Sequence, residues 1–187
     1  RRTGCPLELC IPPVPGLVKV ALEARPERVI LCAAPDRAGE SPRPLDFDAW
    51  GQALPPAVRT LRESGALVAA LLRPSLQAVK AAHTADLAGV ELLCGPALDA
   101  SREGGTLDGD RNATAAEVEL LADAAQLAAK LRIDVGVCGG LSFDNSAALS
   151  DLVPGATHCC VGRSFVERAM LVGVDRAVRD LVSQLQA

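Results

Sequence analysis

The sequence predicts an α/β protein of the TIM (β/α)8-barrel type, with about six of the eight strand–helix units present in its 187 residues. Short apolar runs alternate with amphipathic segments, and each unit takes about 30 residues. The runs are apolar on both faces, which is typical of parallel strands covered by helices. An open doubly wound sheet fits the same alternation. Because a complete barrel needs roughly 250 residues, we expect residues 1–187 to form one partial or divergent barrel domain whose missing units precede Arg1.

Three units are predicted in the first half of the chain. In the first helix, apolar residues recur at helical spacing, and a proline pair interrupts the second. Gly65 fits a C-terminal cap of the second helix, and Ser75 fits the N-cap of the third. The predicted strands are Pro6–Pro12, Arg28–Ala34 and Ala66–Leu72, and the predicted helices are Pro15–Ala24, Leu45–Gly65 and Ser75–Ala85.

Three further units are predicted in the second half. A polar loop over Asp99–Asn112 leads into a long helix, and two helical segments close the chain. The predicted strands are Gly89–Gly95, Ile133–Gly140 and a sixth within Thr157–Phe165, and the predicted helices are Ala113–Arg132, Asn145–Leu152, Arg163–Leu171 and Gly173–Ala187.

Composition excludes several classes of function. The net charge of −4 and the isoelectric point near 5.2 disfavour a general nucleic-acid-binding surface. Aromatic residues make up 2 %, with no Tyr, so base-stacking platforms are absent. No apolar run reaches the roughly 18 residues of a membrane span. We therefore expect a cytoplasmic protein whose partners are small molecules, not nucleic acid or membrane.

Seven cysteines indicate reduced thiols and not a disulfide framework. A zinc site would need paired ligand spacing with histidine, which is missing, so we expect no metal. Six of the seven are expected to behave as small hydrophobes in apolar runs: Cys10, Cys32, Cys94, Cys138, Cys159 and Cys160.

Glycine-rich strand ends suggest where a ligand binds. In parallel α/β folds the site lies at the carboxyl ends of the strands, and backbone N–H groups there suit a phosphate. The fifth and sixth strands lead to Gly139, Gly140 and Gly162, which predict a phosphate cradle within a barrel. The alternative is that they are ordinary turn glycines. Neither a dinucleotide-binding fingerprint nor a P-loop is present.

Four ionisable residues are candidates for chemistry. Glu8 interrupts an apolar run and, by strand alternation, points opposite to its neighbours. It is either a general acid–base carboxylate in the barrel mouth or an outward-facing edge residue. Glu91 is a second carboxylate of the site or a satisfied polar core residue, and His158 is a site residue or a buried imidazole bonded to backbone. His83, near a helix end, is expected to be a solvated surface residue.

Read in order, the units resemble the pyridoxine 5′-phosphate synthase family over nearly the whole chain. "LELCIPPVPGLVKVALEARPERVILCAAPDR" resembles the third strand, its helix and the fourth strand of that family. "LRESGALVAALLRPSLQAVKAAHTADLAGVELLCGPALDA" resembles its fifth and sixth units, and "GVCGGLSFDN" its seventh. The most specific match is "HCCVGRSFVERAMLVGVDRAVRDL", which resembles the eighth.

The resemblance implies a TIM barrel that assembles into homo-octamers and needs no metal or organic cofactor. It implies an enzyme that condenses 1-deoxyxylulose 5-phosphate with 3-amino-2-oxopropyl phosphate into pyridoxine 5′-phosphate, releasing phosphate and water. Glu8 falls on the family's catalytic glutamate, and Ser41 near a substrate-binding Thr. Four residues fall on or beside positions that contact substrate phosphate: Gly139, Gly140, Thr157 and His158.

The sequence also departs from the family pattern. Gly139 stands where the family places a proton-donating His after the seventh strand, and Leu93-Cys94 replace a His-Thr pair. The motifs of the first two strands, with a further catalytic His and Arg residues, are absent from these residues. The first hypothesis is therefore a synthase of this type, and the alternative is a catalytically impaired or non-catalytic relative that binds phosphorylated ligands.

Overall fold

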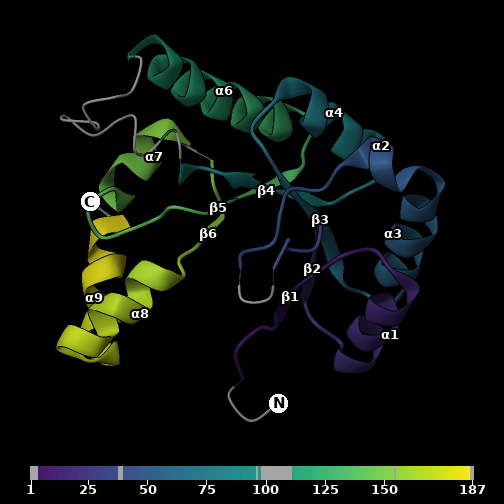
Figure 1. Ribbon diagram of the computed structural model, residues 1–187, viewed down its shortest axis with the longest axis horizontal. Coiled ribbons are helices and arrows are strands. Elements are labelled where there is room, and N and C mark those ends of the chain that lie inside the picture. Colours follow the sequence, from purple (N-terminus) through teal and green to yellow (C-terminus); the bar gives the residue numbers. More distant parts are fainter. Residues whose placement is uncertain (1–3, 38–39, 96, 98–110, 154, 186–187) are drawn as a thin grey trace.

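The computed structural model describes residues 4–37, 40–95, 97, 111–153 and 155–185. Six strands form one parallel sheet in the order of the sequence, with crossover helices on its outside (Figure 1). A doubly wound sheet would reverse its strand order at a switch point, and this sheet does not. The prediction of a partial barrel is confirmed. The strands are β1 (Glu8–Ile11), β2 (Arg28–Leu31), β3 (Leu67–Leu72), β4 (Gly89–Leu93), β5 (Asp134–Cys138) and β6 (His158–Cys160).

The helices that follow the strands lie close to the positions predicted from the sequence. The Ser75 hydroxyl accepts a hydrogen bond from the backbone N–H of Ala78 at 3.1 Å, so the predicted N-cap is confirmed. Gly65 adopts φ +90° just beyond a helix end, as its predicted capping role requires. The α-helices are α1 (Pro15–Ala24), α2 (Phe47–Trp50), α3 (Leu54–Glu63), α4 (Leu76–Thr84), α6 (Arg111–Lys130), α7 (Leu149–Leu152), α8 (Arg163–Val172) and α9 (Val174–Leu185), with short 3₁₀ turns η1 (Gly51–Ala53) and η2 (Ser146–Ala148).

The predicted helix over Leu45–Gly65 is wrong in one respect. The chain breaks at Gly51, which adopts φ +40°, and η1 joins α2 to α3. The proline pair does not interrupt a helix, because Pro55 and Pro56 lie in the first turn of α3. There a backbone N–H has no intrahelical acceptor, so proline costs little.

The two faces of the sheet carry different residues. The outer face packs against the helices through side chains such as Val29, Val68 and Leu92, which are fully buried. Burying each of these stabilises the fold by about 1.5–3 kcal/mol. The inner face holds a smaller apolar cluster of Ile30, Cys32, Ala69 and Leu71, and polar residues occupy its other positions. Strand alternation thus separates the helix-covered core from the barrel interior.

The cysteines only partly match the expectation of burial. All seven are free thiols, and Cys32 and Cys94 are buried. Cys10 and Cys160 are exposed, because they face the inner side of the two edge strands of the described sheet. Within the described residues, none of the helices is long and apolar enough to cross a membrane.

Candidate active site

A cavity of about 680 Å³ lies at the carboxyl ends of the strands. This volume suits a small-molecule ligand, and the position is where parallel barrels carry their sites. Its walls come from strand interiors, from the loops after β2, β5 and β6, and from the start of α8. The lining residues used below are Glu8, Ser41, Glu91, Gly139, Gly140, Ser142, Gly162, Arg163 and Ser164.

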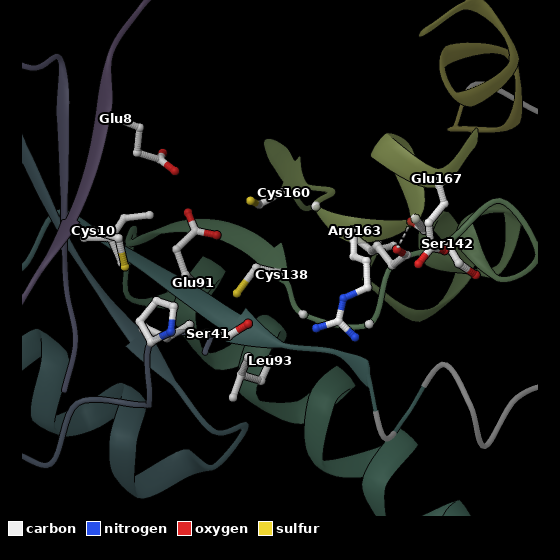
Figure 2. A pocket seen from close by; sticks show the side chains of 18 residues that line it. Glu8, Cys10, Ser41, Glu91, Leu93, Cys138, Ser142, Cys160, Arg163 and Glu167 are labelled. Carbon is white, nitrogen blue, oxygen red and sulfur yellow. Dashed lines mark hydrogen bonds between the residues drawn. The ribbon is translucent and has the colours of Figure 1, made fainter. Parts of the chain in front are cut away.

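Two carboxylates stand at the floor of this cavity. Figure 2 shows the carboxylates of Glu8, from β1, and Glu91, from β4, directed toward the same space. Burial, and next the charge of Glu91, raise the pKa of Glu8 against the opposing effect of Arg28. Glu91 is only 1 % exposed, and its Oε2 has no hydrogen-bond partner among the described residues. The pair therefore offers an acid–base group with a raised pKa and a buried acceptor oxygen that has no partner among the described residues.

The loop after β5 brings backbone close to the ligand space. Gly139 and Gly140 adopt φ +73° and +85°, a region that favours glycine. A Cβ at Gly140 would overlap the backbone of Gly95, so this turn also needs glycine for close packing. Asn145 fixes the loop, because its Nδ2 donates to the Gly140 carbonyl at 2.9 Å and its Oδ1 accepts from Ser142 N at 2.8 Å. The turn is thus held in one conformation beside the cavity.

The start of α8 faces the same loop. Gly162 is its N-cap, and the Ser164 hydroxyl donates to the Leu141 carbonyl at 2.7 Å, which ties α8 to the β5 loop. The first N–H groups of a helix lack intrahelical acceptors and attract anions. Arg163 directs its guanidinium into the cavity and is the basic residue among the described lining residues (Figure 2). Sequence reasoning missed Arg163, although its position directly after "VG" at a strand end was a usable signal.

A second polar cluster lies at the amino ends of the strands. Arg28 reaches Glu8 at 3.6 Å and Glu91 at 3.4 Å, and it also pairs with Asp134. Burial opposes ionisation of Asp134, but hydrogen bonds from Thr157 and Arg28 outweigh it and lower the pKa of Asp134. The Arg28 guanidinium, 15 % exposed, is thus shared by three carboxylates.

His158 joins the two clusters. Its Nε2 contacts Glu91 Oε1, and its Nδ1 lies 2.9 Å from the Thr157 hydroxyl. The hydrogen bond with Glu91 is the largest influence on His158 and raises its pKa, although burial acts in the opposite direction. The Thr157 hydroxyl lies 2.6 Å from Asp134 Oδ1, to which it donates. An ordered row of polar groups therefore runs from Asp134 to Glu91.

The candidate site residues predicted from the sequence do not all lie at the same site. Glu8, Ser41, Gly139, Gly140 and Gly162 line the carboxyl-end cavity. Thr157 and His158 do not join them: His158 is the first residue of β6, so both stand at the amino ends of the strands. Their neighbours there are carboxylates, which disfavour an anionic ligand. Their predicted phosphate contact stays a prediction.

Two further expectations can be compared with the structure. His83 is exposed near the end of α4, as predicted. His158 is neither fully buried nor bonded to backbone, as one alternative held, because it is 28 % exposed and contacts a side-chain carboxylate. The polar loop predicted over Asp99–Asn112 lies mostly outside the described residues.

One set of side chains has the composition of a metal site. Glu8, Glu91 and His158 each offer a ligand atom, and these atoms lie within 4.8 Å of one another. Arg28 already contacts both carboxylates, and His158 directly contacts Glu91. The Arg28 guanidinium thus already supplies positive charge to both carboxylates, so we assign no metal to this set.

The architecture and the cavity define a class: a TIM-barrel protein with a ligand-sized cavity at the carboxyl ends of its strands. A mutant tryptophan synthase alpha-subunit from Pyrococcus furiosus has a similar fold, with a TM-score of 0.62 at 18 % identity over 98 % of this chain and 69 % of that one. A BexX/CysO complex structure from Amycolatopsis orientalis matches with a TM-score of 0.52 at 20 % identity, over 90 % of this chain and 59 % of that one. These likenesses concern the fold alone.

Sequence comparison gives the family. The profile described as pyridoxal phosphate biosynthesis protein PdxJ matches residues 2–187, so the chain belongs to this family. Pyridoxine 5′-phosphate synthase of Desulforapulum autotrophicum is 27 % identical over 186 residues, which cover 100 % of this chain and 73 % of the relative. The protein of the same name from a Synechococcus strain is 32 % identical over 169 residues, covering 88 % and 65 %. The chain thus spans about two thirds to three quarters of these relatives.

Proposed function

We propose that this chain carries the substrate site of a pyridoxine 5′-phosphate synthase. The reaction would condense 1-deoxy-D-xylulose 5-phosphate with 3-amino-2-oxopropyl phosphate into pyridoxine 5′-phosphate, phosphate and water. Family membership supports the pathway, and relatives carry this name. One observation carries the proposal: Glu8, a carboxylate with a raised pKa, shares a cavity with two glycine-rich strand ends and Arg163.

The phosphate ends of the substrates belong to the mouth of the cavity. Gly139, Gly140 and Gly162 let backbone N–H groups approach an anion, and the first turn of α8 adds its dipole. Arg163 supplies a formal positive charge, and hydrogen bonds that involve a charged group contribute about 1.5–3 kcal/mol each. Ser41 borders the opposite wall.

The reacting carbon and nitrogen atoms belong to the floor. Condensation of an amine with a ketone and closure of a ring consist of repeated proton transfers, so groups that titrate near neutrality are required. The raised pKa of Glu8 suits a carboxyl that alternates between acid and base. Glu91 offers its unpaired Oε2 to positive charge that develops on the substrate nitrogen.

A non-catalytic binding role is the second candidate. It is favoured by Gly139, which brings no side chain to the position where family members carry an acid–base His. Loss of one general acid costs about 10²–10⁴-fold in rate. A protein that retained the phosphate cradle but lost turnover would still bind the substrates.

Assembly and location remain part of the proposal. Large apolar side chains are exposed on α8 and α9, which supports contacts between subunits of a homo-oligomer, by resemblance an octamer; they are Val166, Met170, Leu171, Val174, Val178 and Val182. Seven free thiols support a reducing, cytoplasmic location.

A turnover assay tests the function. The chain is supplied with both phosphorylated substrates, and pyridoxine phosphate and inorganic phosphate are followed together. We expect turnover in the wild type, a loss of about 10²–10⁴-fold in Glu8→Gln, and no loss in Glu63→Gln, which alters an exposed carboxylate at the end of α3.

The outcomes separate the two candidates. Wild-type turnover no higher than that of Glu8→Gln, together with thermal stabilisation by deoxyxylulose phosphate, would replace the enzyme by the binder. Absence of both turnover and stabilisation would contradict both candidates.

A further inference from the structure

Glu91 and His158 meet across a glycine. Strand register aligns Glu91 of β4 with Gly136 of β5, and Gly136 with His158 of β6. Side chains at these positions point to the inner face, so a side chain on β5 would separate the other two. A Cβ at Gly136 would overlap His158 Nε2 and both carboxylate oxygens of Glu91. Gly136 therefore makes the contact possible.

The contact must contain a proton. The shortest contact of the Thr157 hydroxyl is with Asp134 Oδ1 at 2.6 Å; when the hydroxyl donates there, its oxygen accepts from the Nδ1–H of His158 at 2.9 Å. The neutral ring would then present a lone pair at Nε2 to an ionised carboxylate, which only accepts. With the hydroxyl donating to Asp134, either His158 or Glu91 holds an additional proton, and the raised pKa of His158 favours the imidazolium.

The proton between His158 and Glu91 lies between the amino-end cleft and the carboxyl-end cavity. His158 is 28 % exposed and borders a cleft at the amino ends of the strands. Glu91 is buried, lines the carboxyl-end cavity, and has an unpartnered Oε2. The two carboxylate oxygens of Glu91 thus differ in their contacts: Oε1 contacts His158, whereas Oε2 has no protein partner among the described residues.

We propose that His158 supplies protons to the cavity through Glu91 in a relay. This proposal rests on the proposed synthase function. In the resting pair His158 is the imidazolium and Glu91 is ionised. His158 Nε2 passes its proton to Glu91 Oε1, and rotation of the carboxyl group about its Cγ–Cδ bond brings the O–H to the cavity. The proton then goes to a substrate hydroxyl, whose C–O bond breaks with its electron pair on the departing water. This step leaves Glu91 ionised again, and the neutral imidazole regains a proton from solvent at the amino-end cleft. Charge and protons balance over the cycle.

The charged groups around Glu91 and His158 have opposing effects on the protonation of His158. Arg28 contacts Glu91 at 3.4 Å and opposes the charging of His158, whereas Asp134 Oδ2, 3.9 Å from Nδ1, favours it. Glu8 and the thiols of Cys138 and Cys160 share the inner face with Glu91. Burial raises the pKa of each of them most, and the charge of Glu91 raises it further. His158 is thus a positioning residue that acts on substrate only through Glu91.

A nuclear magnetic resonance titration tests the pair without requiring turnover. The chain has two histidines, so His83→Gln assigns both ring signals. In Glu91→Gln we expect the pKa of His158 to fall, because its largest raising influence is removed. An unchanged titration of His158 in that variant would overturn the relay.

Turnover measurements on variants test whether the reaction uses the pair of Glu91 and His158. His158→Gln keeps a hydrogen-bond donor toward Glu91 but cannot titrate, so we expect kcat to fall about 10²-fold, with KM little changed and the alkaline limb of the kcat profile lost. Gly136→Ala should reproduce this loss by displacing the pair. Gly155→Ala is the matched control, because a Cβ there meets nothing within 4 Å.

The outcomes distinguish the relay from the function that it serves. Turnover of His158→Gln with wild-type kcat and pH profile overturns the relay alone. A wild type without turnover overturns the synthase function and with it the use of the relay, even where the titration shows the pair intact. Equal losses in Gly136→Ala and Gly155→Ala would also contradict the proposal.

Discussion

The two ends of the barrel interior differ in how their charged residues are paired. At the carboxyl ends, glycines, serines and Arg163 line an open cavity, and the carboxylates of Glu8, Glu91 and Glu167 line it as well. At the amino ends, Arg28 is surrounded by Glu8, Glu91 and Asp134, so its charge is already neutralised. The first end is where we propose that substrate phosphate binds, whereas the second is internally paired. Charged residues at both ends of a barrel therefore do not imply ligand sites at both.

The largest effect on stability is expected at the paired end. Arg28→Met would leave Glu91 buried without its guanidinium, and breaking a buried pair costs about 3–5 kcal/mol. Arg62→Met is the matched control, because Arg62 is 43 % exposed and pairs with Asp86 at the surface, where such pairs contribute about 0–1 kcal/mol. Urea unfolding measures both variants, and equal losses would show that the amino-end cluster is not a structural element.

A smaller effect is expected at the open end. Gly140→Ala would force a side chain into the φ +85° region and against Gly95, so we expect a loss of about 1–2 kcal/mol and weaker binding of phosphorylated ligand. Gly155→Ala, with open space around the new methyl group, should change neither quantity. A Gly140→Ala chain with wild-type stability and affinity would contradict the tight turn.

The smallest effect is a pH dependence that originates at the paired end. The pKa of His158 is raised above 6.5, so its contribution to the free energy of unfolding is fully present below that value and is lost as the pH rises through the folded pKa. The pKa of Asp134 is lowered from 3.8, so its contribution is present above that value and is lost in acid. Unfolding between about pH 6 and 8 should show the loss in the wild type and not in His158→Gln.

The sequence was sufficient for the fold and for several residues that line the carboxyl-end cavity. Apolar strands alternating with helices predicted the partial barrel, and parity along β1 predicted that Glu8 faces away from Leu7 and Leu9. Gly139 and Gly140 were recognisable as residues of the cavity because they follow a strand at its carboxyl end, and their contact with phosphate stays a prediction. Each of these inferences depends on neighbours close in the chain.

The other end required the three-dimensional register. In "THCCVG" the local pattern does not tell where β6 begins, and a shift of a few residues moves Thr157 and His158 from one end of the barrel to the other. Gly136 looked unremarkable in the sequence, because its role depends on Glu91 and His158, 67 residues apart in the chain. Such long-range pairing has no sequence signal in a single chain.

Calorimetry with 1-deoxyxylulose 5-phosphate tests the contrast between the two ends most directly. The wild type, Arg163→Gln and Thr157→Ala are titrated under the same conditions. We predict that Arg163→Gln weakens binding about 10–100-fold, as expected for loss of a charged hydrogen bond, while Thr157→Ala binds like the wild type. Loss of binding in Thr157→Ala with Arg163→Gln unaffected would contradict this account and place the phosphate at the amino ends.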